Sequence, residues 1–169
     1  GMLCLAIDDS ERLLQQADMV TALTVEGLLA TDGPFAADLQ ALRPQPGQAI
    51  SAANLRALLK NSPIVASHKI DDSRVQDAYS VRCTPAVHGA ARDTLDHVRR
   101  VAGYELASAI DNPMVLPDGR VESCGNFHGA PLGFAADFLA IALAEVGAIA
   151  ERRMDRMLDQ NRSHGLPPF

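Results

Sequence analysis

The sequence has few cysteines and no arrangement of residues typical of a metal site. Cys4, Cys83 and Cys124 are odd in number and far apart, and no Cys-x-x-Cys pair occurs, so we expect neither a disulfide framework nor a zinc knuckle. The histidines are scattered without a His-x-x-x-His pair, which predicts no metal site. We expect the thiols to be free and buried, as is typical of a reducing cytoplasm.

The signatures of several other functional classes are also missing. The sequence contains no Gly-x-Gly-x-x-Gly or Gly-x-x-x-x-Gly-Lys-[Ser/Thr] loop and no Gly-x-Ser-x-Gly elbow, so nucleotide binding and elbow-type hydrolysis have no support. The net charge is -6 and no basic run with interleaved aromatic residues occurs, so we predict no nucleic-acid partner. No signal-peptide pattern is present, and we expect a cytoplasmic protein.

The chain is instead rich in apolar residues at helical spacing. Hydrophobic residues make up 47% of it, and a length of 169 residues suits a single domain over 1–169. The spacing predicts helices over residues 10–29, 35–42, 51–59 and from 85 to just before 111, with Ser10 as the first N-cap. Residues 43–47 are a clear break, and residues 61–73 are expected to form a loop.

A last predicted helix, residues 132–150, is apolar on nearly every side and approaches the length of a membrane span. Asp137 and Glu145 lie inside it, however, and each acid at a bilayer centre would cost roughly 2.5–3.5 kcal/mol. We therefore predict no membrane partner and place this helix in the middle of a bundle or oligomer core. The fold class is then all-α, a long-helix bundle with a small β-hairpin near residues 113–123.

Two polar clusters precede predicted helices. In VQDAYSVRC, residues 75–83, a turn or helical spacing places Gln76, Tyr79 and Arg82 roughly on one face. An amide, a phenol and a guanidinium together can hold a small anion, and the arginine can grip a carboxylate through two hydrogen bonds. In CGNFHG, residues 124–129, glycines allow unusual turns around a polar–aromatic–polar triplet. Residue types alone leave an ordinary polar loop as the simpler interpretation of each cluster.

Five segments occur together and in order: RPQPGQ (43–48), VQDAYSVRCTPAVHGAARD (75–93), AIDNPMV (109–115), CGNFHGAPLGFAADFLAIALAEVGAIAERR (124–153) and GLPPF (165–169). Taken together, they resemble the aromatic amino acid ammonia-lyases, and most of all the histidine ammonia-lyases. Phenylalanine and tyrosine ammonia-lyases and the aminomutases share much of the pattern, which covers nearly the whole chain.

The resemblance implies a homotetramer whose active sites draw residues from more than one subunit and bind a small aromatic amino acid. It also implies elimination of ammonia, in the histidine-type enzymes from L-histidine to give trans-urocanate. The family's electrophile, 4-methylideneimidazol-5-one (MIO), forms from an internal Ala-Ser-Gly, which this sequence lacks. We therefore expect the chain to be an internal part of the central region of a larger lyase, and inactive alone.

By resemblance, Arg82 corresponds to the arginine that binds the substrate carboxylate. Tyr79 corresponds to a tyrosine beside the electrophile, implicated in substrate positioning and proton handling, and Gln76 to a glutamine of the same pocket. Phe127 corresponds to a phenylalanine packed near MIO, and its neighbours Asn126 and His128 belong to the same substrate-binding loop. The chain departs from the family pattern at two positions where relatives often carry Gln or Glu, and either could alter the pocket: Ala86 and Ala130.

Other interpretations stay open. The apolar helix over residues 132–150 would also suit a non-catalytic helical oligomerisation module. A phenylalanine or tyrosine ammonia-lyase or an aminomutase is a further alternative, because the residues that select the substrate lie largely outside this chain in the enzymes it resembles. The fumarase–aspartase class also eliminates ammonia, but its Gly-Ser-Ser-x-Met-Pro-x-Lys-x-Asn loop is missing.

Overall fold

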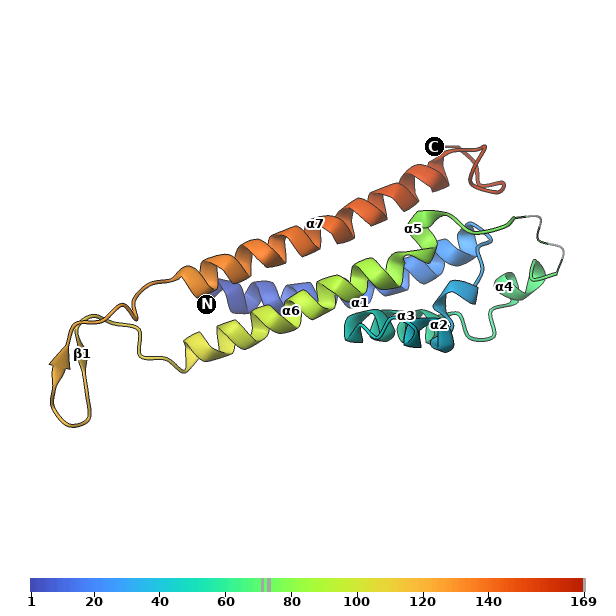
Figure 1. The fold of residues 1–169 in the computed structure, drawn as a ribbon. Helices are drawn as coiled ribbons and strands as arrows, with labels where there is room; N and C mark the ends of the chain where they lie inside the picture. The colour runs from blue at the N-terminus through green and yellow to red at the C-terminus, as the bar shows by residue number, and fades with distance from the viewer. Residues whose placement is uncertain (71, 73, 169) are drawn as a thin grey trace.

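The computed structural model describes residues 1–70, 72 and 74–168 as an elongated helical bundle with a small hairpin at one end (Figure 1). In order, the elements are α1 (Met2–Gly27), η1 (Gly33–Phe35), α2 (Ala37–Ala41), α3 (Pro46–Leu58), α4 (Pro63–Ser67), α5 (Tyr79–Arg82), α6 (Thr84–Leu106), β1 (Met114–Val115), β2 (Val121–Glu122) and α7 (Ala130–Leu158). Helix α6 lies at the centre and contacts α1, α3 and α7. The predicted all-α bundle with a hairpin is confirmed.

Most helix positions agree with the sequence pattern, and the disagreements concern where helices begin. Helix α1 begins at Met2, so Ser10 is not its N-cap; the Ser10 hydroxyl instead donates to the Ala6 carbonyl, one turn back inside the helix. Helix α3 begins at Pro46 rather than at residue 51, because a proline suits the first helical turn. Helix α7 continues past residue 150 to Leu158.

The loop predicted over residues 61–73 was wrong in part, because it contains the short helix α4. The Ser62 hydroxyl caps that helix by accepting from the Val65 amide at 3.1 Å. Residues 71 and 73 of the predicted loop lie outside the described part of the chain. The prediction of buried thiols was also wrong: the cysteines are free but only half-buried.

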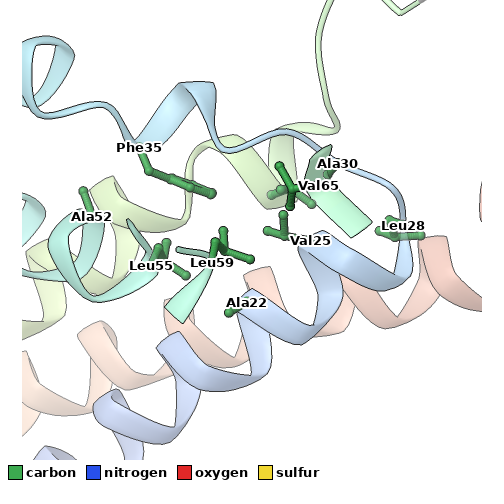
Figure 2. Close-up of a cluster of buried hydrophobic side chains, with 10 residues drawn as sticks. Ala22, Val25, Leu28, Ala30, Phe35, Ala52, Leu55, Leu59 and Val65 are labelled. Atoms are coloured by element: carbon green, nitrogen blue, oxygen red, sulfur yellow. The ribbon is translucent and has the colours of Figure 1, made fainter. Parts of the chain in front are cut away.

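Apolar side chains form two clusters, one joining the end of α1 to η1, α3, α4 and α5, and the other between α1, α6 and α7. Figure 2 shows the first, in which Val25 from the end of α1 meets Phe35, Leu55 and Val65 from the following short helices. The second fills the space between the long helices and is made by Leu14 of α1, Leu95 and Val98 of α6, and Leu139 and Val146 of α7. The first cluster fixes the end of the bundle against which α5 packs, through Val81.

A buried carboxylate, Asp18 on α1, joins three helices. It accepts hydrogen bonds from Ser51 and Asn54 on α3, at 2.7 and 2.8 Å, and from His88 and Arg92 on α6, at 2.8 and 2.7 Å. Burial alone opposes the ionised form, but these bonds and the Arg92 charge hold the pKa of Asp18 below its usual value. Asp18 therefore stays charged at neutral pH and ties α1, α3 and α6 together.

Helices α3 and α6 approach most closely at a pair of glycines, which gives a testable expectation. A Cβ on Gly89 would lie 2.2 Å from the Gln48 backbone nitrogen, and one on Gly47 would lie 2.1 Å from the Gly89 carbonyl oxygen. Replacing Gly89 with alanine should therefore push the helices apart and lower the free energy of unfolding by about 1–3 kcal/mol.

The matched control for Gly89→Ala is Gly103→Ala on the same helix, because nothing lies within 4 Å of a Cβ at Gly103. Alanine suits a helix better than glycine, so this variant should gain about 0.5–1 kcal/mol. Urea denaturation measures both changes. Equal stabilities of the two variants would contradict the close approach of α3 and α6.

Helix α7 is only partly covered by the rest of the chain. By length and composition it could cross a membrane, and its most apolar 18-residue window has a mean hydropathy of 1.8, with 22% of that window buried. Phe134, Phe138 and Ile141 are exposed along it, and so are the charged residues Asp137 and Glu145. The exposed surface is thus apolar and interrupted by acids.

Candidate active site

The one-turn helix α5 carries the two predicted catalytic side chains. Tyr79, its first residue, is 72% exposed, and Arg82, its last residue, is half-buried. Between Gln76 and Tyr79, the buried Asp77 carboxylate accepts from the Thr31 amide at 2.9 Å and from the Thr31 hydroxyl at 2.7 Å. This pair of bonds fastens the chain just before α5 to the turn that follows α1, so Tyr79 and Arg82 stand on an anchored segment.

Arg82 is oriented by its own main chain. Its Nε donates to the Asp77 carbonyl oxygen at 2.9 Å, which fixes the plane of the guanidinium. Within residues 1–70, 72 and 74–168, no carboxylate lies within ion-pair distance of Arg82, and neither terminal nitrogen makes a hydrogen bond. Arg82 can therefore offer both terminal nitrogens to an anion from outside the chain.

A second arginine holds the preceding loop and was not singled out from the sequence. Arg74 pairs with Asp72 at 2.7 Å and also donates to the carbonyl oxygens of Leu28 and Leu29 at the end of α1. Its hydrogen bonds hold the pKa of the Asp72 carboxyl well below the usual range. No sequence signal separated Arg74 and Asp77 from ordinary polar loop residues, because the contacts that tie them to the end of α1 reach residues 46 positions away along the chain.

Tyr79 lies at a groove between α5 and α7 with a volume of about 440 Å³. Ser80 and Val87 line it on the same side, and Glu145, Ile149, Arg152 and Arg156 line it from α7. Gln76 lines a separate, much smaller pocket together with Arg74 and Asp77, and Arg82 lines neither cavity. These two pockets do not contain Gln76, Tyr79 and Arg82 together, and their placement on one face stays a prediction.

The second predicted cluster lies at the other end of the bundle. Asn126, Phe127 and His128 are exposed just before α7, and Phe127 is 60% exposed. The His128 Nδ1 accepts from the Ala130 amide at 3.2 Å and so helps to begin α7. Figure 1 shows α5 beside the C-terminal half of α7, whereas this loop lies at its N-terminal end.

The two clusters do not meet in one chain. Tyr79 shares its groove with Ile149, and α7 begins at Ala130. With a rise of 1.5 Å per residue, these α7 positions are about 30 Å apart. A site containing both Arg82 and Phe127 would therefore need more than one copy of the chain.

The order and geometry of these segments agree with a known family. A family model described as "Aromatic amino acid lyase" matches residues 1–169. The chain belongs to this family. The histidine ammonia-lyase of Streptomyces coelicolor is 61% identical to it over 169 residues, which are 100% of this chain and 33% of that relative. The chain thus spans about a third of the length of this curated lyase.

Solved structures of aromatic amino acid lyases and aminomutases share the fold. The tyrosine aminomutase from Streptomyces globisporus superposes with a TM-score of 0.91 at 37% identity, over 100% of this chain and 36% of that one. The histidine ammonia-lyase from Trypanosoma cruzi superposes with a TM-score of 0.85 at 38% identity, over 99% and 30% of the two chains. Among the described residues of this lyase-family chain, no group of three or more His, Cys, Asp or Glu side chains could hold a metal ion.

Proposed function

We propose that the complete protein is a carbon–nitrogen lyase that eliminates ammonia from L-histidine to give trans-urocanate. In this proposal the chain supplies the wall that binds the substrate carboxylate. The observation that carries it is Arg82, a half-buried guanidinium oriented through Nε and without an acidic partner in the described part of the chain. The 61% identity to a histidine ammonia-lyase supports the choice of substrate.

Arg82 suits an amino acid carboxylate for a geometric reason. Its two terminal nitrogens can donate parallel hydrogen bonds to the two oxygens of one carboxylate. The Nε bond to Asp77 removes part of the rotational freedom that would otherwise be lost on binding. Tyr79, exposed at the neighbouring groove, is proposed to position the substrate and to hold or move a proton at its phenol oxygen.

The proposed chemistry includes MIO, which supplies an electrophile that takes up the substrate. The sequence contains no Ala-Ser-Gly, so we propose that the segment forming this group lies outside these residues. The exposed Tyr79 phenol and Phe127 ring fit such a group, because each presents an uncovered aromatic surface next to which it can dock. Asn126 and His128 would line the Phe127 side of the same site.

Self-association is part of the proposal, as a cytoplasmic homotetramer. The 30 Å separation of the α5 and Phe127 regions along α7 favours sites assembled from several copies, because one chain cannot bring them together. The uncovered apolar surface of α7 offers a contact for such copies, and we prefer this role to a membrane span because Asp137 and Glu145 interrupt it. The free thiols are compatible with a reducing compartment.

An aminomutase is the second candidate, because the superposition on the tyrosine aminomutase is as complete as that on any lyase described above. The same Arg82 wall would bind the carboxylate of either substrate. The two candidates differ in product: a lyase releases ammonia and an unsaturated acid, whereas an aminomutase returns a β-amino acid. Chromatography of the products from L-histidine and L-tyrosine separates them.

Replacing Arg82 with methionine in the complete protein tests the proposal. Hydrogen bonds to charged groups contribute about 1.5–3 kcal/mol, so we expect kcat/KM for L-histidine to fall roughly 10- to 150-fold, chiefly through KM. Urocanate absorbance and released ammonia measure the rate. The control is Arg100→Met, an exposed position on α6, which should stay within about twofold of wild type.

Two results would contradict the proposal. Wild-type protein that forms neither urocanate nor ammonia would refute the lyase activity, and a non-catalytic oligomerisation module would then be the better interpretation. An Arg82→Met variant with an unchanged KM would refute the assigned role of Arg82, even if the lyase activity were present.

A further inference from the structure

Arg153 is a buried cation that the proposed chemistry does not yet use. It is 2% exposed on α7, and within the described residues no carboxylate lies within 4.0 Å of its guanidinium. Burial lowers the pKa of Arg153 to about 10, against the opposing charge of Asp18, so the side chain stays protonated at neutral pH. The half-buried Arg74 and Arg92, by contrast, pair with Asp72 and Asp18.

Burying an unpaired charge costs several kcal/mol, so we expect Arg153 to have a role that offsets this cost. An acidic side chain from another subunit cannot easily pair with Arg153, because a side chain with 2% exposure is reachable only if the bundle opens. The polar contacts of Arg153 all lie within its own chain, among the described residues. Its neighbour Arg152, by contrast, is exposed and paired with Glu151.

The contacts of Arg153 lie at the junction of α5 and α6. Its Nη1 donates to the Ser80 carbonyl oxygen at 3.3 Å and to the Thr84 hydroxyl oxygen at 3.1 Å. The Thr84 hydroxyl in turn donates to the same Ser80 carbonyl at 3.2 Å. Ser80 lies between Tyr79 and Arg82, and Thr84 begins α6, so these bonds hold the main chain on both sides of Arg82.

Helix α5 depends on such contacts because it has only four residues. An isolated helix of this length is unstable in water, so its position must come from its surroundings. Asp77 holds its N-terminal side to Thr31, and Arg153 holds its C-terminal side to α7. Together they fix both ends of the segment that presents Tyr79 and Arg82.

We propose that Arg153 is a positioning residue that holds α5 against α6 and α7 and thereby aims the Arg82 guanidinium at the substrate carboxylate. The proposal rests on the function proposed above. It gives the buried charge a specific role, because a guanidinium bonds to the Ser80 carbonyl and the Thr84 hydroxyl at once, whereas an apolar side chain of similar length can fill the space without bonding either.

The decisive experiment compares ligands with and without a carboxylate on the complete protein. The variants are Arg153→Met, which removes the donor; Arg153→Lys, which keeps the charge; and Thr84→Val, which removes one acceptor at nearly constant shape. The ligands are imidazolepropionate, which carries a carboxylate, and histamine, which does not, each measured as a competitive inhibitor of ammonia release from L-histidine. Arg100→Met is the control.

We expect Arg153→Met to weaken imidazolepropionate binding and raise KM about tenfold while leaving histamine binding within about twofold. Arg153→Lys should bind imidazolepropionate more tightly than Arg153→Met does. Thr84→Val should weaken that binding less than Arg153→Met does. A general structural role would weaken both ligands equally, so equal weakening, or no weakening, overturns the proposal. If Arg153→Met does not fold, Thr84→Val decides by the same comparison.

The outcomes also separate this inference from the proposed function. Wild-type protein that releases no ammonia from L-histidine would overturn the proposed function and the role of Arg153 with it. Active wild-type protein, combined with variants that keep the wild-type preference for imidazolepropionate over histamine, would overturn the role of Arg153 alone.

Discussion

Replacing Tyr79 with phenylalanine is expected to lower kcat for ammonia release roughly 10²- to 10⁴-fold, the range that a positioned proton-transfer group contributes. The substitution removes only a hydroxyl. That hydroxyl makes no hydrogen bond within the described residues, and the side chain is 72% exposed, so the fold does not depend on it. The loss should therefore appear in kcat with an unchanged Tm.

The chain contains a matched control for this substitution. It has two tyrosines, and Tyr104 on α6 is also 72% exposed but lies outside the groove between α5 and α7. Tyr104→Phe should leave kcat within about twofold. Rates come from the released ammonia, and Tm from calorimetry. A Tyr79→Phe protein as active as the Tyr104→Phe protein would remove Tyr79 from the proposed proton chemistry.

The long central elements could be predicted because their sequence signals are local. Helix α6 has an early proline and a regular apolar stripe, and α7 is apolar over many turns. The prediction of Ser10 as an N-cap was wrong because a serine hydroxyl can also donate to the carbonyl one turn back. A serine in the sequence therefore does not distinguish a cap from a helix interior. Helix α4 was missed because residues 61–73 show no strong apolar period.

The candidate site was predictable in part for a similar reason. Tyr79, Arg82 and Phe127 lie in contiguous motifs, so resemblance to a family could place them in the sequence. The resemblance could not predict that Tyr79 and Phe127 lie near opposite ends of α7, because this placement follows from how the helices pack. Resemblance likewise gave no role to Asp77 or Arg153, whose partners lie 46 and 73 positions away.

The Asp18 network joins residues that lie 33 to 74 positions apart in the sequence, and it gives the largest expected change in stability. Replacing Asp18 with asparagine should lower the free energy of unfolding by roughly 3–5 kcal/mol, the usual effect of breaking a buried ion pair. The carboxylate accepts four hydrogen bonds, from Ser51, Asn54, His88 and Arg92. An asparagine must turn its amide donors toward some of these donors and leaves the Arg92 charge unpaired.

The same substitution should change how stability depends on pH. The pKa of Asp18 is lower in the folded chain than its ordinary value of 3.8, so the unfolded chain binds the proton more tightly. Its stabilisation is therefore complete well above pH 3.8 and is lost as the pH falls through the unfolded and then the folded pKa. Asp72, Asp118 and Asp159 also have lowered pKa values, so wild-type acid sensitivity alone does not identify Asp18.

The difference between wild type and Asp18→Asn isolates its contribution, because the other carboxylates titrate in both proteins. Urea unfolding at a series of pH values should show a gap that is constant near neutral pH and narrows as the pH drops below about 4. Asp96→Asn, at an exposed position on α6, should run parallel to wild type with a gap below about 1 kcal/mol. A gap between wild type and Asp18→Asn that stays constant down to acid unfolding would mean that the pKa of Asp18 is the same in the folded and unfolded chains, and a gap that widens as the pH falls would mean that the folded bundle holds Asp18 as a neutral acid.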